Sequence, residues 1–127
     1  MSTLHPAEHR LAAEPRSVRA ARRVVTETVG DVLPEDELEG VLLATSEVVT
    51  NAVEHGAPPI DLRVDRADER IRVEVRDASP LRPRLRDMEP GPSEVRGRGM
   101  TIVERVTDRW GIEPTVDGKA VWFELDL

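Results

Sequence analysis

A carboxylate and a carboxamide, Glu47 and Asn51, lie four residues apart in a stretch whose apolar residues have helical spacing. On a helix, this spacing places the two side chains one turn apart on the same face. A side-chain amide oxygen suits Mg2+, and a nearby carboxylate can polarise a water or a hydroxyl group. Taken alone, the pair also fits a plain solvated ridge, which is the commoner use of polar residues at this spacing.

Asp77 ends the segment 71–77, in which apolar residues at positions 71, 73 and 75 alternate with charged ones. Strand alternation therefore predicts that Asp77 lies on the core-facing side. A buried carboxylate needs a partner, because unpaired burial is costly. Asp77 can accept a hydrogen bond from an exocyclic amine such as that of adenine, or it can cap the loop that follows.

The third signal is the segment Gly97-Arg98-Gly99-Met100, which is predicted to open a helix running from about Arg98 to Asp108. A short glycine pair taken alone is usually a turn. The carboxylate and amide pair, the aspartate at a strand end and the glycine segment occur here in a fixed order. Together they indicate a nucleotide site.

These segments resemble the N box, the first glycine box and the second glycine box of the GHKL, or Bergerat-fold, ATPases. Within them the chain is most similar to the stand-alone anti-sigma factor and serine-protein kinase branch, and the likeness extends from residues 15–22 to residues 118–125. The resemblance implies that Glu47 is the general base, Asn51 the Mg2+ ligand and Asp77 the carboxylate that reads adenine.

The same resemblance implies that Gly97, Arg98, Gly99 and Met100 bind ATP close to its phosphates, where free amides and the helix dipole favour an anion. ATP and Mg2+ are the implied cofactors. The implied partners are a sigma factor and an anti-sigma factor antagonist, and a homodimer is compatible with the likeness. No direct nucleic acid and no membrane are expected as partners.

The chain departs from the family at the first glycine box, which usually reads D-x-G-x-G. Here the residues are Asp77-Ala78-Ser79-Pro80-Leu81, without either glycine. Proline and β-carbons restrict the backbone, so we expect weak ATP affinity and slow turnover. Residues 80–92 hold four prolines and three arginines with few apolar residues. They predict a mobile loop in the place of the ATP lid, at about residues 78–96.

Composition indicates one cytoplasmic domain. The chain has 127 residues, of which 39% are hydrophobic, enough for a single core. We expect residues 1–14 to be a tail or an edge strand and residues 15–127 to form the ATPase-like domain. The absence of cysteine excludes disulfides and thiolate metal sites, and a net charge of −7 disfavours nucleic-acid binding. No apolar run approaches the length of a membrane span or a signal peptide.

The coarse element order is helices and antiparallel strands. Helices are expected from Pro15 to Gly30 and from Pro34 to Gly56, and strands at 60–64 and 71–77 form a hairpin. A final hairpin turns at Asp117-Gly118. The predicted fold is a two-layer α/β (α+β) sandwich, a mostly antiparallel sheet covered on one face by three helices. Trp122 has the outward phase, and we expect the N-terminal segment or a partner to cover it.

Three functions follow from this pattern. The leading one is an ATP-dependent protein serine/threonine kinase that also sequesters a partner, as the anti-sigma factor likeness implies. The second is a non-catalytic protein-binding module with weak or structural ATP binding. The third, the detached ATPase portion of a histidine kinase, is disfavoured because the chain has no room for a phosphoacceptor helix pair.

Overall fold

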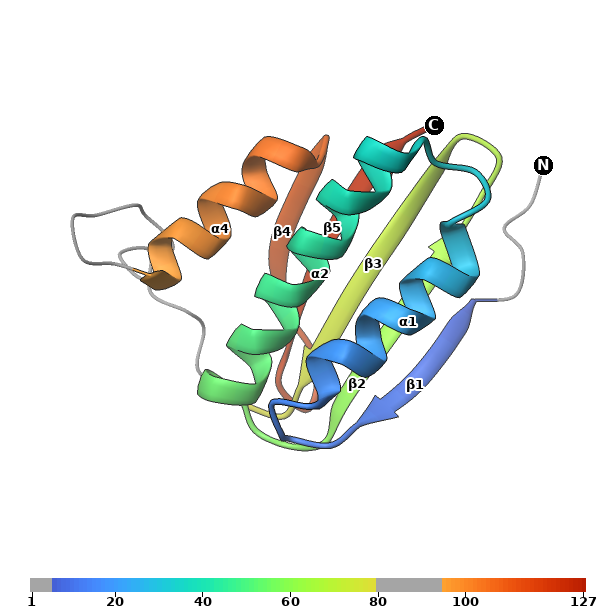
Figure 1. Ribbon diagram of the computed structural model, residues 1–127. Helices are drawn as coiled ribbons and strands as arrows, with labels where there is room; N and C mark the ends of the chain where they lie inside the picture. Colours follow the sequence, from blue (N-terminus) through green and yellow to red (C-terminus); the bar gives the residue numbers. More distant parts are fainter. Residues whose placement is uncertain (1–5, 80–94) are drawn as a thin grey trace.

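The computed structural model describes residues 6–79 and 95–127, and for residues 95–100 it describes the backbone alone. Within these residues the chain forms a five-stranded sheet in the order β1-β2-β3-β5-β4, with every neighbouring pair antiparallel. Three helices cover one face of the sheet (Figure 1). The elements are β1 (Ala7–Leu11), α1 (Ser17–Val29), α2 (Glu35–His55), β2 (Ile60–Arg66), β3 (Arg70–Asp77), α4 (Val95–Val106), β4 (Arg109–Pro114) and β5 (Lys119–Asp126). The predicted two-layer architecture is confirmed.

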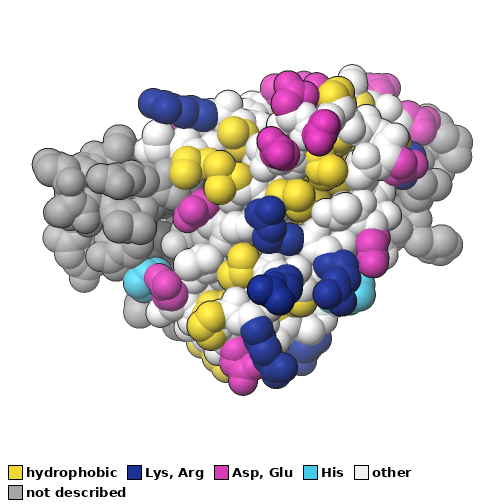
Figure 2. All heavy atoms as spheres, in the orientation of Figure 1, with side chains coloured by type: hydrophobic (Ala, Val, Ile, Leu, Met, Phe, Trp, Pro, Cys, Tyr) yellow, Lys and Arg dark blue, Asp and Glu magenta, His cyan; other side chains and the backbone are white. Residues whose placement is uncertain are grey.

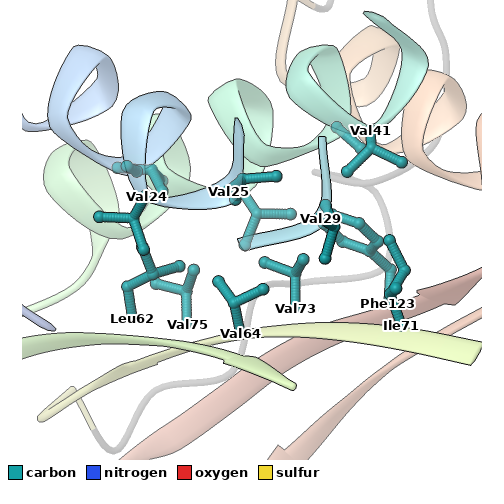
Figure 3. Close-up of a cluster of buried hydrophobic side chains, with 14 of the residues drawn as sticks. Val24, Val25, Val29, Val41, Leu62, Val64, Ile71, Val73, Val75 and Phe123 are labelled. Carbon is teal, nitrogen blue, oxygen red and sulfur yellow. The ribbon is translucent and has the colours of Figure 1, made fainter. Parts of the chain in front are cut away.

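The core lies between the helices and the sheet. Strands β2 and β3 alternate as predicted, so that one face of each strand is apolar and buried. Valines of α1 and α2 point down onto these strands and onto Phe123 of β5 (Figure 3). Burying each such side chain contributes about 1.5–3 kcal/mol. This contact fixes α1 and α2 on the sheet and with them the residues that α2 carries.

Helix α2 has a clear start and end in the sequence. Pro34 precedes it in an extended conformation, and three acidic residues occupy its first turn, where they complement the helix dipole. The backbone N–H of Gly56 donates to Ala52 O at 2.9 Å and closes the last turn. The helix therefore delivers Glu47 and Asn51 at fixed positions in its second half.

Helix α4 differs from its predicted bounds. It begins at Val95 and ends at Val106, where the expectation was about Arg98 to Asp108. Gly97 and Gly99 therefore lie inside the first two turns, and the helix tolerates them although each costs about 1 kcal/mol relative to alanine. It ends earlier because the Asp108 N–H donates to Glu124 O at 2.9 Å, which draws the chain into β4.

The outer face of the sheet is covered by its own long side chains. Trp122 of β5 lies opposite Gly111 of β4, and a β-carbon at Gly111 would lie 2.8 Å from the Trp122 ring. The Arg72 guanidinium stacks 4.4 Å from the ring centroid. The Trp122 ring therefore packs on Gly111 and is covered by Arg72. The N-terminal strand β1 lies at the edge of the sheet beside β2, separated from β5 by β2 and β3.

Charge is unevenly spread over the helical face. Figure 2 shows acidic side chains over the start of α2 and basic side chains over α1. The acidic group includes Glu35, Asp36 and Glu37 of the first turn of α2. Among residues 6–79 and 95–127, no helix is long and apolar enough to cross a membrane.

Candidate functional site

Glu47 and Asn51 lie in the second half of α2, and both side chains are half-buried. Partial burial, and secondly the nearby carboxylate of Glu54, raise the pKa of Glu47 above its ordinary value. A carboxylate whose pKa is moved toward neutrality is better matched to accepting and returning a proton. The structure therefore places a carboxylate with a raised pKa one helical turn from an amide oxygen of the kind that hard cations bind.

Asp77, at the end of β3, is buried on the core-facing side as its strand phase predicts. Its Oδ1 accepts a hydrogen bond from the Ser79 backbone N–H at 2.7 Å, so the carboxylate caps the following loop. The Lys119 Nζ donates to the same carboxylate, at 3.0 Å from Oδ1 and 2.8 Å from Oδ2. Asp77 therefore caps the loop, which is one of the two predicted roles. For the other role, an adenine amine would meet a carboxylate that already has internal partners.

The end of α2 packs directly on Asp77. A β-carbon at Gly56 would lie 2.6 Å from the Asp77 Cγ, which leaves no room for a side chain there. The glycine that ends the helix thus permits the close approach of α2 to β3. Asp77 and the C-terminal end of α2, which carries Asn51, belong to one end of the molecule (Figure 1).

Helix α4 brings its N-terminal end to the same region. Near the start of α2, a β-carbon at Gly40 would lie 3.3 Å from Val106 at the end of α4. The two helices therefore run antiparallel, and the start of α4 lies toward the end of α2 (Figure 1). The N–H groups of its first turn, before residue 98, have no acceptor within the helix. Such a helix start favours an anion.

The predicted ATP-binding segment Gly97-Arg98-Gly99-Met100 forms part of these first turns of α4. Glu47, Asn51, Asp77 and this segment thus converge on one end of the molecule. The predicted lid, at about residues 78–96, falls almost entirely on residues 80–94, which lie outside the described residues.

The sequence prediction missed Lys119. The residue follows the turn at Asp117-Gly118, where a lysine is ordinarily exposed. The signal was its phase, because residues 119, 121, 123 and 125 share the core-facing side of β5. Asp77 and Lys119 are direct cross-strand partners in the β3–β5 pairing.

The residues present can be compared with what Mg-ATP requires. In the described parts of the chain, no three histidine, cysteine or acidic side chains gather closely enough to hold a metal ion. Mg2+ would therefore be held by Asn51 together with the phosphates of the nucleotide. On the phosphate side, the residues present suit Mg2+ and phosphate groups: they are Asn51, Glu47 and a helix start. On the adenine side the acceptor is present, but Lys119 already pairs with it.

A family profile decides the classification of the chain. The profile of the histidine kinase-like ATPase domain matches residues 11–125, which is nearly the whole sequence. The chain belongs to the histidine kinase-like ATPase family. Membership implies ATP binding, usually with Mg2+, and the GHKL resemblance is confirmed at this level.

A solved structure is similar to this histidine kinase-like ATPase domain. The histidine kinase domain of the blue-light activated histidine kinase of Erythrobacter litoralis matches with a TM-score of 0.60 and 18% sequence identity. The match covers 89% of this chain and 60% of that chain. The likeness shows a common fold, and the chain spans less than two thirds of the matched chain. No match was found among curated proteins.

Proposed function

We propose that this protein is an ATP-dependent regulatory protein that transfers phosphate to a serine or threonine hydroxyl of a small antagonist protein. In this proposal it also binds a sigma factor, and phosphorylation of the antagonist decides which partner it holds in the cytoplasm. The observation that carries the proposal is the setting of Glu47. Its pKa is raised by burial, and it lies one helical turn from Asn51.

Each residue has a distinct task. Asn51 would hold Mg2+, which supplies charge neutralisation at the phosphates when it is bound. The start of α4 would bind the phosphates through its backbone N–H groups. Glu47 would accept the proton from the hydroxyl that is phosphorylated. Glu47 makes the hydroxyl oxygen a stronger nucleophile without leaving its place on α2.

The alternative is a non-catalytic binding module in which ATP is weakly held or structural. The specific observation that favours it is the Asp77–Lys119 ion pair, which occupies the carboxylate expected to read adenine. Ser79 and Leu81 stand where the family has its two glycines, and this departure points the same way. The two functions differ in one measurable property, the transfer of phosphate to a protein.

The test is a phosphotransfer assay with γ-labelled ATP, Mg2+ and a candidate antagonist protein. We expect label on the antagonist with the unmodified protein and a loss of about 100-fold or more with Glu47→Gln, which keeps the size of the side chain but not its basicity. Glu39→Gln is the matched control, because Glu39 is exposed on the same helix away from the site. Transfer by Glu47→Gln at the unmodified rate would exclude Glu47 as the base. An unlabelled antagonist that nevertheless binds would favour the binding module.

A further inference from the structure

Lys119 is the single lysine among the 18 Lys and Arg residues of the chain. Lysine is almost never buried this deeply unless it is paired. Here the side chain is 6% exposed, and its partner Asp77 is 1% exposed. The two side chains depend on each other in this pair, because removing one partner leaves an uncompensated charge in the interior.

The carboxylate of Asp77 is enclosed on several sides. Its Oδ1 accepts hydrogen bonds from the Ser79 N–H and from Lys119, and its Oδ2 lies 2.8 Å from the Lys119 Nζ. A β-carbon at Gly56 would lie 2.7 Å from Oδ2, so the end of α2 closes another approach. An amine arriving from outside therefore cannot reach either oxygen while these groups keep their places.

Of these groups, the Lys119 side chain is the one that can move. Ser79 N–H and Gly56 belong to the backbone. A β-carbon at Gly118 would collide with the backbone of Asp77 and Ala78, which shows how tightly β5 is held against the end of β3. Lysine carries its ammonium on a flexible four-carbon stem. The ammonium can therefore leave the carboxylate without any change in strand register.

We propose that Lys119 competes internally for Asp77, so that an adenine base reaches this carboxylate only by displacing the Lys119 ammonium. The inference rests on the proposed function, because it concerns ATP at the same site. Its consequence is a loss of base selectivity. While Lys119 holds Asp77, the carboxylate contributes little to the preference for adenine over a base that lacks the exocyclic amine.

Calorimetry with two nucleotides tests the proposal. Mg-ATP is compared with Mg-ITP, whose base carries a carbonyl oxygen where adenine has its amine. We expect the unmodified protein to discriminate between them by less than about threefold. Lys119→Met should bind ATP about ten- to a hundredfold more tightly, as expected for a hydrogen bond to a charged group. Its affinity for ITP should stay unchanged.

The double variant Asp77→Asn/Lys119→Met is the matched control, because it removes both charges. It should lack the gain in ATP affinity. Without nucleotide, Lys119→Met should melt at a lower temperature than the unmodified protein, since Asp77 is left buried and unpaired. The double variant should recover most of that loss. This second readout needs no nucleotide and no activity.

A third measurement uses the unmodified protein alone. Because Lys119 is the only lysine, 15N-lysine labelling gives a single side-chain Nζ signal. We expect saturating Mg-ATP to shift this signal and saturating Mg-ITP to leave it in place. A signal that ATP does not move, or that both nucleotides move equally, would overturn the proposal. So would a strong preference for ATP that Lys119→Met leaves unchanged.

The outcomes separate this inference from the proposed function. If the unmodified protein and Lys119→Met bind ATP with equal affinity, the competition is refuted and ATP-dependent phosphotransfer is untouched. If neither binds ATP, Lys119 is not what limits binding, and both proposals fail. If Lys119→Met gains ATP affinity but phosphotransfer does not occur, the competition stands and the kinase reading fails.

Discussion

The raised pKa of Glu47, the base in the proposed function, has a consequence for the stability of the protein. Burial, and secondly Glu54, raise its pKa above the ordinary value of 4.5. A pKa that is higher in the folded state means that folding favours the protonated form. The corresponding stability is fully present below about pH 4.5 and is lost as pH rises through the folded pKa. At neutral pH the ionised Glu47 therefore costs the protein some stability.

Glu47→Gln should consequently melt at a higher temperature than the unmodified protein at pH 7, and at about the same temperature near pH 4. Melting curves by circular dichroism across this range would measure the difference. Glu39→Gln, at an exposed position of the same helix, is the matched control. A Glu47→Gln variant that is less stable at pH 7 would contradict the raised pKa.

At the scale of the elements, the spacing of α2 and α4 depends on Gly40. Its missing β-carbon allows Val106 to approach, and a β-carbon would meet the Val106 Cβ at 3.3 Å. Gly40→Leu should force α4 away from α2 and destabilise the fold by about 1–3 kcal/mol. Because α4 brings the segment 97–100 to the site, ATP binding should weaken as well.

Urea unfolding and nucleotide titration of Gly40→Leu would measure both effects. Glu39→Leu is the matched control, since it adds the same side chain at an exposed neighbouring position of α2. Unchanged stability in Gly40→Leu would show that α4 can move freely against α2. In that case the close contact would not position the segment 97–100.

The elements differ in how well the sequence predicts them. The hairpin at 60–77 and the core-facing phase of Asp77 follow from local alternation, and the proline and acidic residues at 34–37 mark the start of α2. The ion pair between Asp77 and Lys119 could not be predicted in this way. It depends on the β3–β5 register, which joins residues 42 positions apart. The start of α4 also differs from its predicted position, because Gly97 and Gly99 favour a helix that opens there, whereas the helix already begins at Val95.

At the scale of the whole molecule, the open face of the sheet is held by a charge network that joins three strands. Burial raises the pKa of Glu74, but hydrogen bonds from Arg76 and Arg72 outweigh it and hold the pKa below its ordinary value. The pKa of Glu124 is also held below its ordinary value, because hydrogen bonds donated by Arg109 and Arg72 outweigh the effect of burial. The network links β3, β5 and β4 across the side of the sheet that the helices leave open.

A folded pKa below the unfolded value gives stability that is present above about pH 4.5 and is lost as pH falls through the folded pKa. The melting temperature should therefore fall in this acid range. Glu74→Gln should be less stable than the unmodified protein at pH 7, and the difference should shrink as the pH falls. Thermal melts between about pH 3 and pH 7 would test this. A constant difference at every pH would show that the ionised carboxylate is not what stabilises the sheet.

The central claim is that Mg-ATP binds where α2, β3 and the start of α4 meet. Calorimetric titration of Mg-ATP into the unmodified protein and into Asn51→Ala tests it most directly. We predict saturable, Mg2+-dependent binding that Asn51→Ala weakens. Ligand at about 100 times its Kd should add about 2.7 kcal/mol of stability and raise the melting temperature by several degrees. No heat of binding and no thermal shift at millimolar Mg-ATP would contradict the claim.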